Sequence, residues 1–337
     1  MTTPAAKPRV LVTIPMFDGV LSTLREHVEV DSVGQTALED PAELARRAQG
    51  CAGLIVAGTP RIDAALLAAC PSIKAVCSMA VGYNNIDLPA CTAAGVLVSN
   101  APDVLTETTA DFGFALMMAT ARRITESEHF LRAGHWTQWR FDLFAGADVH
   151  GATLGVLGMG RIGQAIARRG ALGFGMPVIY HNRSRLDAAT EQALGARWVG
   201  KDALLQQADH LVIVVPYSPA SHHLVAAPEL ALMKASATLT NIARGGVVDD
   251  AALAEALRAR RIAAAGLDVF EGEPVVHPAL LALPNVVLTP HIASASLRTR
   301  RAMADLAARN LLAALGLGPD AGRPATALNP QVLAAAA

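Results

Sequence analysis

The sequence has no excess of charge of either sign, and this excludes the binding classes that need one. Lysine and arginine number 28 against 29 aspartates and glutamates, so the formal net charge is −1. Charged residues make up only 17% of the chain. Because proteins that bind nucleic acid or anionic lipid attract phosphate with a basic surface, we expect no nucleic-acid partner.

Long apolar runs and cysteine motifs are also missing. No stretch approaches the roughly 18 consecutive apolar residues of a membrane-spanning helix, and the apolar run near the N-terminus is too short for a signal peptide. We therefore expect no membrane association and a cytoplasmic location. The cysteines contain no Cys-x-x-Cys pair, so neither a disulfide framework nor a metal site is expected. They are interpreted as small buried thiols: Cys51, Cys70, Cys77 and Cys91.

What the sequence does contain is a series of short apolar runs that alternate with helical patterns. Continuous apolar runs are typical of strands buried on both faces of a parallel α/β sheet. They fall into one group within the first 100 residues and a second group from residue 153 onward, which predicts two α/β units. The predicted strands are 9–14, 53–58, 73–82, 95–100, 153–158, 177–180, 210–216, 237–243, 264–270 and 285–290.

A glycine fingerprint follows the run at 153–158. Gly158, Gly160 and Gly163 have the G-x-G-x-x-G spacing, with a buried strand before them, a helical pattern after them and another strand about 20 residues on. In such a βαβ unit the glycines allow a tight turn, close approach of a pyrophosphate, and close helix–strand contact. The backbone N–H groups of Arg161 and Ile162 would face the phosphates at the helix N-terminus.

The end of the next strand reads "HNRSR", where an NAD-binding chain usually has an acid. Asn182 stands 19 residues after Gly163 and is neutral, and Arg183, Ser184 and Arg185 follow it. An acid there would repel a 2′-phosphate, whereas two arginines and a hydroxyl can bind one. The segment therefore predicts a preference for NADP(H), with NAD(H) still possible. The alternative is that both arginines are only solvated surface charges.

Three further strand ends carry a guanidinium, a carboxylate and an imidazole. Arg244, Glu273 and His291 follow the last three predicted strands, and open α/β sheets bind ligands at the carboxyl ends of their strands. An arginine can bind a substrate carboxylate and polarise a neighbouring ketone. A histidine oriented by a glutamate can deliver a proton. Each residue alone is ordinary, but together, after a nucleotide fingerprint, they predict carbonyl reduction.

From about residue 50 to 330 the sequence resembles the D-isomer-specific 2-hydroxyacid dehydrogenases. It looks most similar to their glyoxylate/hydroxypyruvate reductase and 2-ketogluconate reductase branch. The segments that carry the resemblance, in the family's order, are "VGYNNID", "LTETTAD", "LGMGRIG", "NIARGGVVD", "GLDVFEGEP" and "PHIASAS".

The resemblance implies a role for individual residues. Arg244 would bind substrate, Glu273 would support the histidine, and His291 would be the acid/base. The backbone at Val81 and Gly82 would hold the substrate carboxylate, and Ser294 would line the same pocket. Asp268 would contact the nicotinamide carboxamide, and further cofactor contacts are expected at Pro216, Ile242 and Ala243.

The resemblance also implies the architecture. Two Rossmann-like or flavodoxin-like domains with parallel sheets are expected, with the substrate domain split around an inserted dinucleotide-binding domain. The expected boundaries are 1–101 and 291–337 for the substrate domain and 102–290 for the NAD(P)-binding domain. Members of the family pair as homodimers through a segment that corresponds to about 103–150. Trp136 and Trp139 fall there, either as interface anchors or as ordinary packing residues.

The expected function is NADPH-preferring reduction of small 2-oxo acids such as glyoxylate, hydroxypyruvate or 2-keto-D-gluconate to 2-hydroxy acids. A different class stays open, because nucleotide-sensing corepressors of this fold keep the same arginine, glutamate and histidine. An NAD-dependent D-lactate or D-glycerate type dehydrogenase is a further alternative. Glu273 argues against formate dehydrogenases, which pair the histidine with glutamine.

Overall fold

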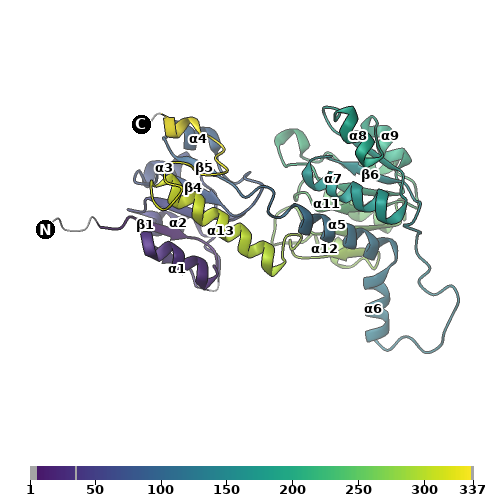
Figure 1. The fold of residues 1–337 in the computed structure, drawn as a ribbon. Coiled ribbons are helices and arrows are strands. Elements are labelled where there is room, and N and C mark those ends of the chain that lie inside the picture. Colours follow the sequence, from purple (N-terminus) through teal and green to yellow (C-terminus); the bar gives the residue numbers. More distant parts are fainter. Residues whose placement is uncertain (1–5, 35, 335–337) are drawn as a thin grey trace. The chain divides into compact units, whose positions relative to one another are not determined.

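The computed structural model describes residues 6–34 and 36–334. The chain divides into two compact units, one formed by Met1–Leu105 with Ser296–Ala337 and the other by Thr106–Ala295 (Figure 1). The first unit is thus discontinuous in sequence. His291 falls in the second unit, whereas the sequence predicted it at the start of the returning segment of the first. Among the described residues, no helix combines the length and the apolar character that a bilayer crossing requires.

The first unit contains a five-stranded parallel sheet. The strand order is β2-β1-β3-β4-β5, the doubly wound order of flavodoxin-like folds. The strands are β1 (Arg9–Val12), β2 (Glu29–Ser32), β3 (Gly53–Val56), β4 (Ala75–Ser78) and β5 (Leu97–Ser99). The edge beside β5 is covered by the returning chain, where buried Asn329 accepts a hydrogen bond from the Val98 backbone N–H at 2.7 Å.

Helices cover both faces of this sheet because successive strand residues point to opposite sides. Val10 and Val12 pack with α1 and α13, while Leu11 between them packs with the helices of the other face. The helices are α1 (Asp18–His27), α2 (Pro41–Ala48), α3 (Ala64–Ala69), α4 (Leu88–Ala93), α13 (Leu297–Ala314) and α14 (Gln331–Ala334).

The second unit contains a seven-stranded parallel sheet in the order β12-β11-β10-β9-β6-β7-β8. From β6 the chain runs outward through β7 to β8, then crosses to β9 on the other side of β6 and continues outward, as in a Rossmann fold. The strands are β6 (Leu154–Leu157), β7 (Val178–His181), β8 (Ala196–Trp198), β9 (His210–Ile213), β10 (Thr238–Asn241), β11 (Ala264–Leu267) and β12 (Val286–Leu288).

Two apolar layers hold this sheet. One contains residues of α5 and α7, such as Phe114 and Ile166, and the other contains residues of α9, α10 and α11, such as Leu204, Leu230 and Leu253. The α-helices are α5 (Thr106–Ala121), α6 (Ile124–Arg132), α7 (Arg161–Arg168), α8 (Ala188–Leu194), α9 (Lys201–Gln207), α10 (Ala227–Leu232), α11 (Asp250–Arg258) and α12 (Pro278–Leu281). A short π-helix, Arg169–Gly173, extends α7, and a 3-10 turn, Pro219–Ser221, follows β9.

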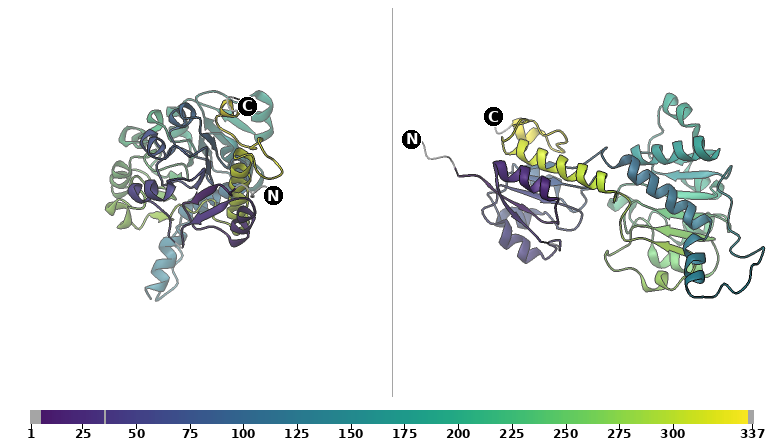
Figure 2. Two further views of the ribbon diagram at one scale, coloured as in Figure 1. Left: turned by 90° about the vertical axis from the view of Figure 1, so that its left-hand side faces the viewer. Right: turned by 60° about the horizontal axis from the view of Figure 1, so that its bottom comes forward.

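Helix α6 and the segment after it extend away from the rest of the second unit (Figures 1 and 2). No residue of α6 is buried. Trp136, Trp139 and Phe141 beyond it are 54%, 74% and 91% exposed. Packing within the described part of the chain therefore does not account for these aromatic side chains.

The expected fold class is confirmed, since both units are α/β with parallel sheets. Each of the ten predicted runs contains a strand. Among the strands of the described residues, only β2 and β8, one edge strand of each sheet, were not predicted.

Candidate active site

The residues singled out in the sequence after position 150 gather at one edge of the second sheet. All neighbouring strands in this sheet are parallel, so their carboxyl ends lie on the same side. The order β7-β6-β9-β10-β11-β12 places the glycine loop and Asn182 toward one end of this edge, and Arg244, Glu273 and His291 toward the other. The sheet reverses its winding between β6 and β9, the position where such folds bind dinucleotides.

The loop between β6 and α7 has the shape that a pyrophosphate requires. Gly158 has φ +104°, and a Cβ on Gly163 would lie 2.3 Å from the Gly158 carbonyl oxygen, so neither position tolerates a side chain. Gly160 caps α7, and a Cβ there would meet nothing within 4 Å. The exposed side of Gly160 and the N-terminal end of α7 fit an anionic group. These residues therefore fit the phosphates of a dinucleotide.

Asn182 joins the end of β7 to the glycine loop. Its Oδ1 accepts a hydrogen bond from the Met159 backbone N–H at 2.6 Å. The backbone carbonyl oxygen of Asn182 accepts a hydrogen bond from Trp198 Nε1–H at 3.2 Å. Asparagine thus holds the loop as an aspartate could, but without adding a negative charge. Trp198 belongs to β8, the edge strand that the sequence did not reveal.

The two arginines after Asn182 have different surroundings. Arg185 forms a bidentate ion pair with Glu191, at 2.8 and 2.6 Å. Glu191 also accepts a hydrogen bond from the Tyr180 hydroxyl, which in turn accepts one from the Leu186 backbone N–H. Arg183 is exposed and makes no hydrogen bond or ion pair within the described residues. The geometry therefore leaves Arg183, rather than Arg185, available for a phosphate.

His291 and Glu273 are brought into direct contact from different strand ends. His291 Nδ1 and Glu273 Oε2 share a hydrogen bond of 2.7 Å. The His291 backbone is in the left-handed region, with φ +52°. A non-glycine residue there is strained by roughly 1–3 kcal/mol, a cost that proteins retain mainly where function needs it. With Nδ1 engaged, Nε2 is the ring nitrogen left for proton transfer, and the side chain is 44% exposed.

Glu273 is itself held in place by its own loop. Its Oε1 accepts a hydrogen bond from the Phe270 backbone N–H at 2.9 Å. Burial alone would raise the pKa of Glu273, but the hydrogen bond with His291 and the charges of His291 and Arg244 outweigh it and leave the pKa below its ordinary value. The carboxylate therefore stays ionised at neutral pH.

Arg244 follows β10 in a tightly packed turn. A Cβ on Gly245 would lie 1.6 Å from the Phe270 carbonyl oxygen, so only glycine lets the Arg244 turn approach the loop that carries Glu273. Burial lowers the pKa of the Arg244 guanidinium, and the nearby Glu273 charge opposes that effect. Arginine stays protonated in proteins. Its Nη1 donates to the Ala243 carbonyl oxygen at 2.7 Å, which leaves the other donors of the guanidinium for a substrate.

Asp268 has a role that sequence reasoning missed. It is fully buried, and its carboxylate accepts hydrogen bonds from the backbone N–H of Ile292 (2.9 Å) and Ala293 (2.8 Å) and from the Thr289 hydroxyl (2.7 Å). The Asp268 carbonyl oxygen accepts another from the His291 N–H. Asp268 thus fixes the turn that carries His291. The signal in the sequence was only an acid at a strand end, which does not distinguish this role from cofactor contact.

The remaining predicted residues lie in both units. Ile242 and Ala243 are buried beside Arg244, Pro216 is exposed after β9, and Ser294 is half-buried after His291. Val81 and Gly82 belong to the first unit, where the Val81 carbonyl oxygen accepts a hydrogen bond from Asn100 at 2.8 Å.

Comparison with known proteins shows the family of the chain. The family model "D-isomer specific 2-hydroxyacid dehydrogenase, NAD binding domain" matches residues 114–293. A glyoxylate reductase of Thermococcus onnurineus is 46% identical over 316 residues, covering 91% of this chain and 92% of the relative. A glyoxylate/hydroxypyruvate reductase B of Klebsiella pneumoniae is 42% identical, covering 97% of this chain and 99% of the relative.

The fold of the chain is also similar to that of a solved enzyme structure. The NADPH-dependent glyoxylate/hydroxypyruvate reductase of Sinorhizobium meliloti, in complex with NADP and malonate, superposes with a TM-score of 0.84. It is 36% identical, and the match covers 96% of this chain and 98% of that one.

The fold and the site define an oxidoreductase that acts on CH–OH groups and uses a nicotinamide dinucleotide. The chain belongs to the D-isomer-specific 2-hydroxyacid dehydrogenase family, and within it to the glyoxylate/hydroxypyruvate reductase branch. The resemblance noted in the sequence is thereby confirmed.

Proposed function

We propose that this protein reduces small 2-oxo acids, such as glyoxylate, hydroxypyruvate and 2-keto-D-gluconate, to the corresponding 2-hydroxy acids, with NADPH as the preferred reductant. The observation that carries the proposal is the Glu273–His291 hydrogen bond at the same sheet edge as Arg244 and the glycine loop. The names of the related glyoxylate and glyoxylate/hydroxypyruvate reductases support the substrate class.

The residues divide the chemistry between them. When bound, the nicotinamide supplies the hydride, which goes to the carbonyl carbon of the 2-oxo acid. Arg244 binds the substrate carboxylate and polarises the adjacent carbonyl oxygen. His291 Nε2 delivers the proton to that oxygen as the C–O π bond opens, and Glu273 stabilises the imidazolium before the proton leaves. Val81, Gly82 and Ser294 supply further substrate contacts.

The cofactor preference follows from the end of β7. Asn182 adds no charge that would repel a 2′-phosphate, and exposed Arg183 and Ser184 can donate to one. One charge-assisted hydrogen bond contributes about 1.5–3 kcal/mol, which corresponds to roughly 10- to 100-fold in affinity. The NADPH-dependent relative from Sinorhizobium meliloti supports this choice. The wider nucleotide contacts of the proposal include Pro216, Ile242, Ala243 and Asp268.

The proposal includes a homodimer in the cytoplasm. The exposed aromatic side chains after α6 are those that an interface would bury. All four cysteines are free and buried thiols, as is usual in a reducing compartment.

A panel of 2-oxo acids assayed with NADPH and with NADH tests the proposal. We expect turnover of glyoxylate and hydroxypyruvate, with a KM for NADPH at least about tenfold below that for NADH. Turnover only with NADH would instead favour a D-lactate or D-glycerate type dehydrogenase. Nucleotide binding without turnover of any 2-oxo acid would favour a nucleotide-sensing protein.

A further inference from the structure

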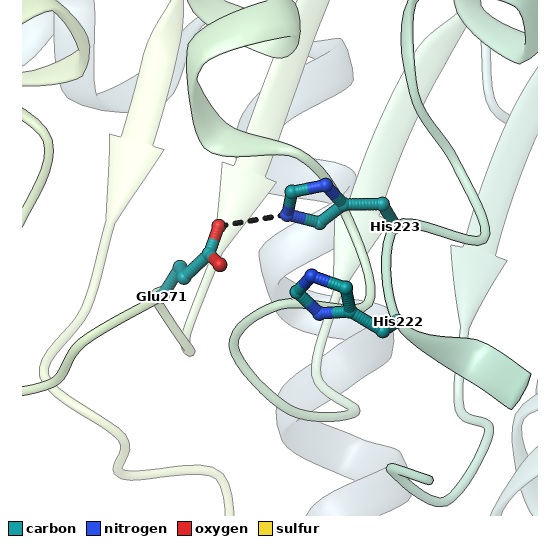
Figure 3. A group of neighbouring side chains, drawn as sticks. All are labelled: His222, His223 and Glu271. Carbon is teal, nitrogen blue, oxygen red and sulfur yellow. Dashed lines mark hydrogen bonds and ion pairs between the residues drawn. The ribbon is translucent and has the colours of Figure 1, made fainter. Parts of the chain in front are cut away.

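A second cluster of chemically reactive side chains lies on loops of the second unit and has no part in the proposed reaction. His222 and His223 follow β9, and Glu271 follows β11 (Figure 3). One ligand atom from each of the three lies within 4.8 Å of the others. We propose that His222, His223 and Glu271 form a binding site for a zinc-class divalent metal ion, although the sequence led to the expectation of no metal site.

The ligand atoms are near enough to converge on one ion. Zinc is bound tetrahedrally by histidine nitrogen and carboxylate oxygen at about 2.0–2.2 Å, so two ligand atoms on one ion are about 3.3–3.6 Å apart. The ligand atoms of the cluster lie within 4.8 Å of one another, so the side chains need to approach by up to about 1.5 Å to hold an ion. His222 is exposed and the Glu271 side chain is 43% exposed, so both can rotate to do so.

The backbone is arranged to present both imidazoles together. His223 has φ +48°, in the left-handed region, and its N–H donates to the Gly246 carbonyl oxygen at 2.7 Å. The two histidine rings are stacked, with centroids 3.9 Å apart and an interplanar angle of 21°. Consecutive residues in ordinary extended backbone point to opposite sides. The strained conformation therefore brings two potential ligands to the same side.

A carboxylate behind His223 completes the pattern. His223 Nε2 contacts Glu271 Oε2 at 2.9 Å, while Nδ1 faces Asp249 Oδ2 at 3.8 Å. Histidine ligands in metal sites commonly direct their second nitrogen toward a carboxylate, which fixes the ring and raises its basicity. Asp249 is already fixed, because its Oδ1 caps α11 through the Ala252 N–H. Imidazole and carboxylate together favour Zn²⁺ over Mg²⁺ or Ca²⁺.

Titration of the full chain with Zn²⁺ by isothermal calorimetry, without cofactor, tests the site. We expect one binding event that weakens at least about tenfold in His222→Ala and in Glu271→Gln. His291→Ala and His135→Ala are the matched controls, because one removes the other histidine–glutamate pair and one removes an exposed histidine elsewhere. The event should persist in both.

Three results would overturn the proposal. They are no Zn²⁺ binding by the wild-type chain, unchanged affinity in both His222→Ala and Glu271→Gln, or loss of the event in His291→Ala. Circular dichroism of each variant establishes that it is folded. Because the readout is binding and not turnover, its outcome is independent of the reductase proposal.

Discussion

At the scale of single residues, we propose that asparagine rather than aspartate at position 182 favours NADP(H) over NAD(H). Either side chain could accept the Met159 N–H and hold the glycine loop. Only the neutral one leaves the site without repulsion toward a 2′-phosphate. The residue type at position 182 led to the prediction of an NADP(H) preference. The sequence alone did not distinguish Arg183 from Arg185 as phosphate ligands. Their difference depends on Glu191, six residues after Arg185, which folding brings against its guanidinium.

Replacement of Arg183 by alanine should raise the KM for NADPH by about 10- to 100-fold and leave the KM for NADH nearly unchanged. Arg185→Ala is the matched control and should change the NADPH KM much less, because its guanidinium is paired with Glu191. Steady-state kinetics with both cofactors measure the effect. Equal losses with NADPH and NADH in Arg183→Ala would show that this residue does not contact the 2′-phosphate.

The Glu191 pair predicts a pH dependence of stability. Hydrogen bonds from Arg185 and Tyr180 outweigh burial and lower the pKa of Glu191 from 4.5 to about 2. A lowered pKa stabilises the folded state above the ordinary value and loses that effect as pH falls through the folded value. The difference in free energy of unfolding between wild type and Glu191→Gln should therefore be constant above about pH 4.5 and shrink toward pH 2. Denaturant titrations of both proteins at several pH values measure this difference in free energy of unfolding. A difference that grew as the pH fell would contradict the prediction.

At the scale of elements, the apolar strands were predictable and the partly polar ones were not. Each sheet has one edge strand of each kind, since β5 and β12 were predicted and β2 and β8 were not. Central strands are apolar on both faces, as in "VLV" of β1 and "LGVL" of β6. Strands β2, "EVDS", and β8, "ARW", contain charged residues and are partly exposed, so they carry no such pattern. The site could be predicted where side chains carry the chemistry. It could not where backbone geometry does, as in the turn of His291 and the approach of Gly245 to Phe270.

The turn after β12 should depend on Asp268. Asp268→Asn keeps the shape but replaces one acceptor oxygen by a donor, which opposes the N–H groups of Ile292 and Ala293. We expect a fall in kcat of about 10- to 100-fold, because a displacement of about 1 Å is enough to misplace His291. Thr289→Val, which removes only the hydroxyl donor to the same carboxylate, should have a smaller effect. An unchanged kcat in Asp268→Asn would exclude a positioning role.

At the scale of the molecule, the second unit contains both the nucleotide fingerprint and the three reactive side chains. The loop with Val81 and Gly82 belongs to the first unit. This division follows from topology, since the parallel strands of the second unit all end on one side. The sequence predicted that strand ends would converge, but not which atoms would meet there.

The exposed aromatics after α6 predict assembly. Substituting aspartate for both Trp139 and Phe141 should convert a dimer into monomers, because a charge in a buried apolar interface is strongly unfavourable. Light scattering coupled to size-exclusion chromatography measures the mass directly. A variant that stays dimeric, or a wild-type chain that is monomeric, would show that this segment does not form a dimer interface.

The most direct test of the account is the rate of NADPH oxidation with glyoxylate in wild type and in His291→Ala. General acid catalysis contributes roughly 10²–10⁴-fold, so the variant should lose at least about 10²-fold in kcat while it still binds NADPH. A variant that turns over glyoxylate at nearly the wild-type rate would show that the imidazole held by Glu273 is not the proton donor.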